Sequence, residues 1–370
     1  MNMQNYKECV YDLLKELCEI PAPSHHEDKR AEFCKNYLLA AGYEDVYIDG
    51  AKNVICGLNY ENSKEITVFV AHTDTVFPDL EPMPYYEKDG KAYCPGIGDN
   101  TASLAVLLVA AKYFKDNNIL SDKGVLFVCN SCEEGLGNLK GVRALMEAYE
   151  GRVARFISFD GKMDRILDKC VGSHRYNVEV ITEGGHSFNA FGNENAISHL
   201  SNIVKKIYEI EVPKKNDSKT TYNVGTISGG TSVNTIAQSA QMLCEYRSDD
   251  VECLAIMKKK FEEIFESSRS DKVEVKITKV GDRPCANGID EKELSALVDD
   301  CRNIIEDMIS KKTIIESGST DCNIPMSMGI PSVCIGVYYG GGMHTREEWI
   351  ELDSLNVGLL LAIKIIKTNL

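Results

Sequence analysis

Residues 65–76 read EITVFVAHTDTV and join an apolar run to a polar end. The apolar part, residues 66–71, is rich in β-branched side chains, which predicts a buried strand. Side chains two apart on an extended chain point to the same face, so His72 and Asp74 can lie side by side. A carboxylate in that position fixes the tautomer of a metal-binding histidine. A structural histidine at a strand end would show the same pattern, so this stretch alone leaves both interpretations open.

Carboxylates recur at later strand ends and strand–helix junctions. Asp99 comes just before an apolar helix predicted over residues 101–114, where capping of the helix is its alternative role. Glu133 and Glu134 follow a buried strand predicted over residues 124–130. Neighbouring side chains on extended backbone diverge, so one glutamate can bind a metal while the other lies beside it. A solvated acidic turn is the alternative for this pair.

The second half of the chain repeats the pattern. Apolar strands are predicted over residues 154–159, followed by Asp160, and over residues 331–338, followed by a glycine-rich loop and His344. Ligands of open α/β sheets bind just outside the carboxyl ends of the strands. Two histidines and three carboxylates at such an edge are enough for two divalent ions with one bridging carboxylate, and the mixed nitrogen and oxygen set suits zinc, cobalt or manganese. The five candidate ligands are His72, Asp99, Glu134, Asp160 and His344.

The pattern of predicted strands and helices changes over residues 173–284, which indicates an inserted domain. Its predicted elements follow the order β-α-β-β-α-β, which is that of a ferredoxin-like sandwich. Strands are expected at 175–182, 220–228, 241–247 and 272–279, with helices at 195–210 and 252–267. We therefore expect an α/β domain made of residues 1–172 and 285–370, interrupted by a complete α+β domain.

Two helices are predicted near the N-terminus, the first over residues 6–20 and the second ending at Ala40. Residues 24–27, SHHE, have the form of a capping box, in which the serine and the glutamate satisfy backbone N–H groups at the start of the second helix. This assignment places the two histidines in an exposed first turn without a metal role.

Composition narrows the class of protein. The chain has 370 residues, 44% of them hydrophobic, and a net charge of −15 from 41 basic and 56 acidic residues. This acidity argues against nucleic acid or an anionic membrane as a partner, and no apolar run has transmembrane length. The 14 cysteines are irregularly spaced and no signal peptide is apparent, which favours reduced thiols and a cytoplasmic location. A redox or zinc-ribbon role suggested by the cysteines is the weaker interpretation.

With these residues in place, the chain resembles a large family of co-catalytic zinc peptidases and amidohydrolases. The family includes peptidase T, carboxypeptidase G, aminoacylase and succinyl-diaminopimelate desuccinylase. The resemblance covers nearly the whole chain, and it rests on the motifs HTDTV, GIGDN, CEEGLGN, FDG, GGHS, GGTSVN, GSTDCN and GGGMHTREEW, in this order. It implies a mixed-sheet catalytic domain that binds zinc, with the insertion serving as a lid and dimerisation domain.

The resemblance also implies a division of the ligands. Asp99 would bridge the two metal ions, His72 and Asp160 would complete one of them, and Glu134 and His344 would complete the other.

Further roles follow from the same resemblance. Asp74 would brace the first ligand histidine, Glu133 would be the general base, and the peptide bond between Asp99 and Asn100 would be cis.

The inserted domain would supply three residues. His186 would stabilise the oxyanion, a loop histidine of no consequence being the alternative. Asn234 and Arg247 would hold the substrate, the arginine by a bidentate grip on a carboxylate. In this family the inserted domains pair into a dimer and the histidine serves the neighbouring subunit. We therefore expect a homodimer with His186 acting in trans.

The substrate class follows from one position. Family members that act as aminopeptidases or dipeptidases tend to have aspartate where Asp160 stands, whereas carboxypeptidases and deacylases tend to have glutamate. We therefore expect a di-zinc aminopeptidase or di/tripeptidase similar to peptidase T, with a small peptide as substrate. The alternative within the fold is an N-acyl-amino-acid amidohydrolase or a carboxypeptidase. From another class, the alternative is a catalytically silent binding protein, which would lack a ligand or the base.

Overall fold

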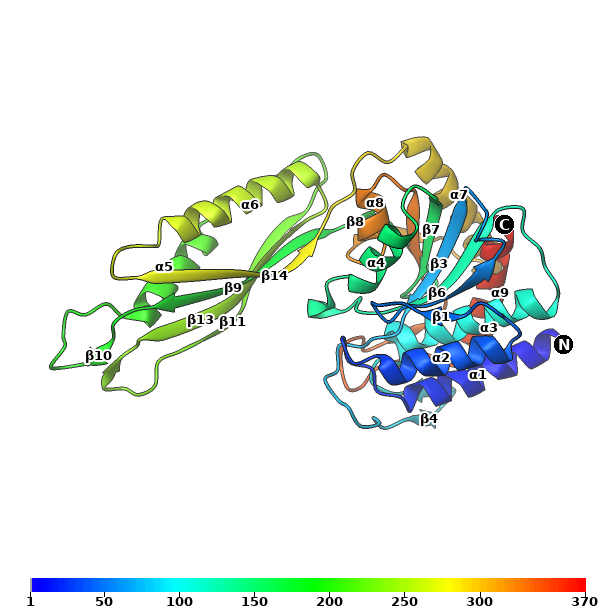
Figure 1. Ribbon diagram of the computed structural model, residues 1–370, viewed down its shortest axis with the longest axis horizontal. Helices are drawn as coiled ribbons and strands as arrows, with labels where there is room; N and C mark the ends of the chain where they lie inside the picture. The colour runs from blue at the N-terminus through cyan, green and yellow to red at the C-terminus, as the bar shows by residue number, and fades with distance from the viewer. Residues whose placement is uncertain (1) are drawn as a thin grey trace. The chain divides into compact units, whose positions relative to one another are not determined.

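The computed structural model describes residues 2–370 and divides into two compact units, each drawn in Figure 1. The first unit comprises the chain up to Cys170 together with Asn287–Leu370, and the second comprises Val171–Ala286. The segment expected as an insertion, residues 173–284, lies inside the second unit, which extends two residues further at each end.

The first unit is built on an eight-stranded mixed sheet, as the α/β interpretation required. β3 pairs in parallel with β6 and β7, whereas β2 runs antiparallel to β6, and β8 antiparallel to β16. The strands in spatial order are β1 (Tyr47–Ile48), β2 (Val54–Leu58), β6 (Gly124–Asn130), β3 (Ile66–His72), β7 (Val153–Phe159), β16 (Ser332–Ile335), β8 (Arg165–Cys170) and β15 (Ile314–Gly318).

The central strands end together at one edge of this sheet. His72 is paired with Asn130, so the residues that follow β3 and β6 leave the sheet side by side. On the other side of β3, Phe159 at the end of β7 is paired with Ile335 at the end of β16. Every residue of β3 and β6 is buried, which fits their continuous apolar sequence. The sheet therefore delivers several loops to the same place.

Helices complete the first unit (Figure 1). α3 is the most buried of them, with every residue from Ser103 to Ala111 inside the core, as its Ala- and Leu-rich sequence predicts. It packs against α1, α2, α9 and strand β3. The helices are α1 (Met3–Cys18), α2 (Asp28–Ala40), α3 (Ser103–Asp116), α4 (Lys140–Ala148), α7 (Glu291–Ile309), α8 (Asn323–Ser327) and α9 (Ser354–Thr368).

Two smaller features carry candidate site residues. A short turn, η1 (Ile97–Ala102), precedes α3, and its backbone departs from helical geometry at Asp99 and Asn100. A second, four-stranded sheet carries the glycine-rich loop of His344 between two of its strands. Its strands are β17 (Gly340–Gly341), β18 (Trp349–Glu351), β5 (Lys91–Tyr93) and β4 (Tyr86–Lys88), and a short 3-10 helix, η2 (Gly135–Gly137), follows the glutamate pair.

The second unit has the order β-α-β-β-α-β that its sequence predicted. Its sheet is antiparallel throughout, with β11 and β14 at the edges, and α5 and α6 pack on one face. A short ribbon, β10 (Gly185–His186) with β12 (Thr235–Ile236), extends from it. The main elements are β9 (Gly172–Ile181), α5 (Ala196–Tyr208), β11 (Thr220–Gly229), β13 (Ser239–Ser248), α6 (Val251–Glu266) and β14 (Glu274–Arg283).

The predicted capping box at residues 24–27 is wrong. α2 begins at Asp28, and Glu27 occupies the N-cap position without a side-chain capping hydrogen bond. The hydroxyl of Ser24 instead donates to Asp74 at 2.6 Å, and the carboxylate of Glu27 accepts the N–H of His25 at 2.9 Å. A local pattern was overridden because this segment packs against the end of β3, where Thr75 donates to the carbonyl of Ala22.

Two further observations concern the whole described chain. None of its helices combines the length and the apolar composition needed to cross a membrane. Of the 14 cysteines, 13 are buried.

Candidate functional site

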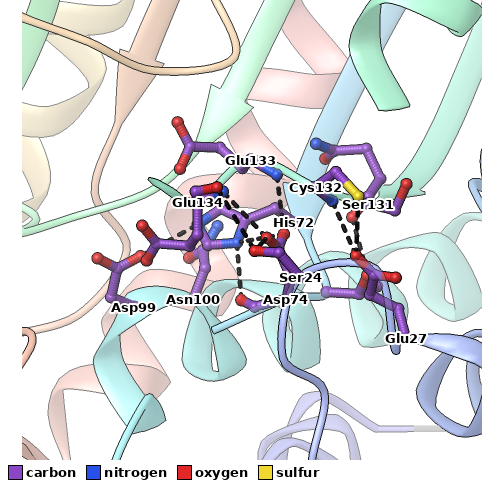
Figure 2. Close-up of polar contacts among 12 residues, drawn as sticks. Ser24, Glu27, His72, Asp74, Asp99, Asn100, Ser131, Cys132, Glu133 and Glu134 are labelled. Carbon is purple, nitrogen blue, oxygen red and sulfur yellow. Dashed lines mark hydrogen bonds and ion pairs between the residues drawn. The ribbon is translucent and has the colours of Figure 1, made fainter. Parts of the chain in front are cut away.

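Three buried side chains from separate elements converge at the edge where the central strands end (Figure 2). They are His72 at the end of β3, Asp99 in η1 and Glu134 after β6, and one potential ligand atom from each lies within 4.8 Å of the others. Asp99 does not cap α3, whose N-cap residue is Ala102. The capping alternative for Asp99 is therefore excluded.

Asp99 lies between two imidazoles. Its Oδ1 is 3.0 Å from Nε2 of His72, and its Oδ2 is 3.0 Å from Nε2 of His344. Nε2 of His344 also lies 3.3 Å from Oε1 of Glu134, and Asp160 Oδ2 lies 3.8 Å from Nε2 of His72. The structure thus brings all five candidate ligands together, and the carboxylate of Asp99 contacts both histidines.

The electrostatics of this cluster fit cations. Burial, together with the charge of Asp99, raises the pKa of Glu134 to about 7 and holds that of Asp160 well above its usual range. The hydrogen bond to Asp99 and the nearby carboxylate of Glu134 raise the pKa of His344 to about 10. Oε1 of Glu134 is buried without a hydrogen bond. A crowded set of carboxylate and imidazole donors with an unsatisfied oxygen is the donor set that divalent metals require.

Asp74 links the histidine to the glutamate pair. Nδ1 of His72 lies 3.0 Å from the backbone oxygen of Asp74 and 3.4 Å from its carboxylate, which leaves Nε2 for a metal. The same carboxylate accepts the backbone N–H groups of Glu133 at 2.9 Å and Glu134 at 3.0 Å, and the hydroxyl of Ser24. One aspartate therefore orients both a candidate ligand and the candidate base.

The loop of Asp99 is held by a residue to which the sequence gave no role. Glu348, 2% exposed, accepts the backbone N–H groups of Gly96 at 2.8 Å, Gly98 at 2.9 Å and Asp99 at 2.8 Å. Burial and the charge of Asp99 raise the pKa of Glu348 to about 7. Its place in the GGGMHTREEW motif was the available signal. The peptide bond between Asp99 and Asn100 is cis, as the resemblance implied.

Two more buried charges were missed by sequence reasoning. Arg30, 2% exposed, donates to the carbonyls of Leu17, Ile20 and Thr73, which ties the end of α1 to the end of β3. Asp321, in the GSTDCN motif, is fully buried and accepts from the amide of Asn130 at 2.8 Å. Burial and the charge of Glu133 raise the pKa of Asp321 to about 8.

The three candidate residues of the second unit lie in two places, at the ribbon of β10 and β12 and on strand β13. His186 is exposed on β10, and its Nδ1 faces the backbone N–H of Phe188 at 3.3 Å. Asn234 is its neighbour, since the carbonyl of Asn234 accepts from Ser187 at 3.0 Å. Arg247, on β13, donates from Nε to Oε1 of Glu245 at 2.8 Å and from Nη2 to Oε2 at 3.1 Å. The guanidinium thus already holds a carboxylate.

Comparisons with known proteins identify the family and the fold of the chain. Residues 68–368 match the family described as Peptidase family M20/M25/M40. The succinyl-diaminopimelate desuccinylase of Corynebacterium glutamicum is 23% identical over 93% of this chain and 92% of the relative. A tripeptidase structure from Staphylococcus aureus has a TM-score of 0.77 at 24% identity and covers 98% of each chain. The aminopeptidase PepT of Bacillus cereus has a TM-score of 0.73 at 22% identity, covering 97% of this chain and 99% of its own. The two structures show that the fold is shared.

Proposed function

The chain belongs to peptidase family M20/M25/M40 and is a metallohydrolase that acts on amide bonds; from this premise we propose that it is an aminopeptidase or di/tripeptidase similar to peptidase T. The observation that carries the hydrolytic chemistry is the arrangement of the glutamate pair, whereas the choice of peptidase over deacylase rests on Asp160. The side chain of Glu134 faces Asp99 and His344, and Asp74 holds the backbone N–H groups of both Glu133 and Glu134. Such a pair provides one ligand and one base.

We propose that this site binds two divalent ions, which would be zinc, with cobalt or manganese as alternatives. Asp99 would be shared, His72 and Asp160 would complete one site, and Glu134 and His344 would complete the other. When bound, the two ions would polarise the scissile carbonyl and lower the pKa of the attacking water.

The chain's own residues perform the proton transfers and hold the substrate. Glu133 accepts a proton from the attacking water and returns it to the leaving amine. His186 donates to the developing oxyanion, and Asn234 and Arg247 hold the peptide. Because Glu245 already occupies Arg247, a substrate carboxylate must compete with it for the guanidinium. We further propose a homodimer formed through the second unit.

Metal stoichiometry tests the shared role of Asp99. The protein is expected to contain two ions per chain by elemental analysis, and His344→Ala to retain one, because only one site loses a ligand. Asp99→Ala is expected to retain neither at the same free metal concentration, since both sites lose a ligand. Retention of one ion by Asp99→Ala would show that the carboxylate belongs to a single site.

Substrate preference tests the peptidase assignment, which rests on Asp160. Di- and tripeptides with a free N-terminus are expected to give a higher kcat/KM than the same peptides after N-acetylation. Matched pairs of peptides, compared at equal zinc, cobalt or manganese loading, provide the measurement. Faster cleavage of N-acetyl or N-succinyl amino acids would establish the amidohydrolase alternative instead.

A further inference from the structure

The turn that carries the glutamate pair uses its carbonyls for backbone hydrogen bonds, for example from Leu139 to Cys132, whereas its N–H groups donate to side chains. Four successive backbone N–H groups, those of residues 131–134, each donate to a side-chain oxygen of another segment. The donors and acceptors are Ser131 to Asn53 at 3.1 Å, Cys132 to Glu27 at 3.2 Å, and Glu133 and Glu134 to the two oxygens of Asp74 at 2.9 and 3.0 Å. Figure 2 shows Glu27 and Asp74 on the same side of this turn. The direction of the Glu133 side chain therefore depends on three separate anchors.

Cys132 is the residue of this turn whose conformation most needs an anchor. Its φ is 56°, in the left-handed region that residues with a Cβ rarely adopt. Its side chain is 1% exposed, and its thiol donates to the same oxygen of Glu27 that accepts its N–H, at 3.1 Å. Glu27 thus grips Cys132 at two points, immediately before Glu133.

Glu27 itself is placed for this contact. It is fully buried in the segment between α1 and α2, and the same Oε1 also accepts the N–H of His25. Lys52, 3.6 Å from its other oxygen, balances the charge. Hydrogen bonds to an ionised carboxylate are stronger than those to a neutral acceptor. Glu27 lies at the start of α2 but does not cap it. Its carboxylate instead contacts the turn that carries Glu133, through Cys132.

We propose that Glu27 is a positioning residue for the general base: by holding Cys132 in the left-handed conformation, it sets the direction in which Glu133 leaves the turn. This inference rests on the proposed function, in which Glu133 moves the protons. When Glu27 is removed, Asp74 still holds the N–H groups of Glu133 and Glu134, so the metal ligand is expected to stay in place, while Cys132, which directly precedes Glu133, loses its anchor.

The first experiment separates positioning from folding and metal binding. Glu27→Ala is expected to lower kcat by roughly 10–100-fold, with KM and metal content unchanged, because a small displacement of a catalytic group has effects of this size. Glu27→Gln keeps an acceptor oxygen and is therefore expected to retain most of the wild-type kcat, unlike Glu27→Ala. Asp28→Asn is the matched control, since Asp28 is an exposed partner of Lys52 at 2.7 Å without contact to the turn, and it is expected to leave kcat unchanged.

Glu27→Asp provides the same test if Glu27→Ala does not fold, because it keeps the charge but withdraws the oxygen by one methylene. A folded Glu27→Ala or Glu27→Asp protein with wild-type kcat would overturn the inference. So would a loss of metal that accounts for the loss of rate.

A double-mutant cycle identifies the residue through which Glu27 acts. In a Glu133→Gln background the base is already absent, so adding Glu27→Ala is expected to cause no further fall in kcat. An equal fall in both backgrounds would show that Glu27 acts elsewhere and would overturn the inference. The proposed function fails separately, if Glu133→Gln alone retains full activity.

Discussion

Glu133→Gln is expected to retain both metal ions while kcat falls by roughly 10²–10⁴, the usual contribution of a general base. Glutamine has nearly the shape of glutamate and keeps the backbone hydrogen bond to Asp74, so the turn is expected to survive. It cannot accept a proton from water. Turnover and elemental metal analysis, measured on the same preparation, test the prediction.

The neighbouring glutamate provides the matched control. Glu134→Gln alters the side chain that faces His344 and is expected to lower metal content together with activity. If Glu133→Gln also loses metal in proportion to activity, Glu133 is a ligand, and the division of labour within the pair is wrong.

The candidate ligands could be found from the sequence because the sheet simplifies the problem. Parallel strands such as β3, β6 and β7 align their carboxyl ends at one edge, so polar residues at those ends meet even when they are far apart in the chain. The apolar runs marked those ends closely, as β3 ends at His72 and β6 at Asn130. Each single residue still had an alternative role, a helix cap for Asp99 and an acidic turn for the glutamate pair. Only the five candidate ligands taken together favoured a metal site.

The supporting residues could not be found in this way, since their partners are distant in sequence and lie on no regular element. Ser24 and Glu27 match a local capping pattern, yet their partners are Asp74, 50 residues away, and Cys132, 105 residues away. The hydrogen bonds of these two side chains to Asp74 and Cys132 take the place of a helix cap, which typically contributes only about 1 kcal/mol. No local rule contains that comparison.

Arg247 shows a signal that was present and unused. Glu245 is two residues earlier on the same strand, and alternate side chains of a strand share a face, so their ion pair follows from the spacing alone. Arg175, opposite Glu245 on the neighbouring strand, also donates to it, at 3.1 Å. The resemblance assigned Arg247 to substrate binding and left out Glu245, whose carboxylate competes with the substrate for the guanidinium.

Removing His186 is expected to lower kcat by roughly 10²–10³, the usual effect of losing an oxyanion donor. His186 belongs to the second unit, whereas the five candidate ligands belong to the first. Its exposure leaves it available to a partner, and the edge strands β11 and β14 carry backbone groups that can pair with a second copy of the chain. In a dimer, the histidine of one subunit is therefore expected to serve the centre of the other.

Complementation tests this arrangement. His186→Ala and Glu133→Gln proteins, each nearly inactive, are mixed in equal amounts under conditions that exchange subunits. A mixed dimer has one site with an intact Glu133 and the intact His186 of the other subunit, so random exchange is expected to restore about a quarter of wild-type activity. The same mixture without exchange is the control. If the exchanged mixture stays inactive although mixed dimers are shown to form, His186 acts within its own chain or has no catalytic role. Only action in trans places an intact Glu133 and an intact His186 at one site.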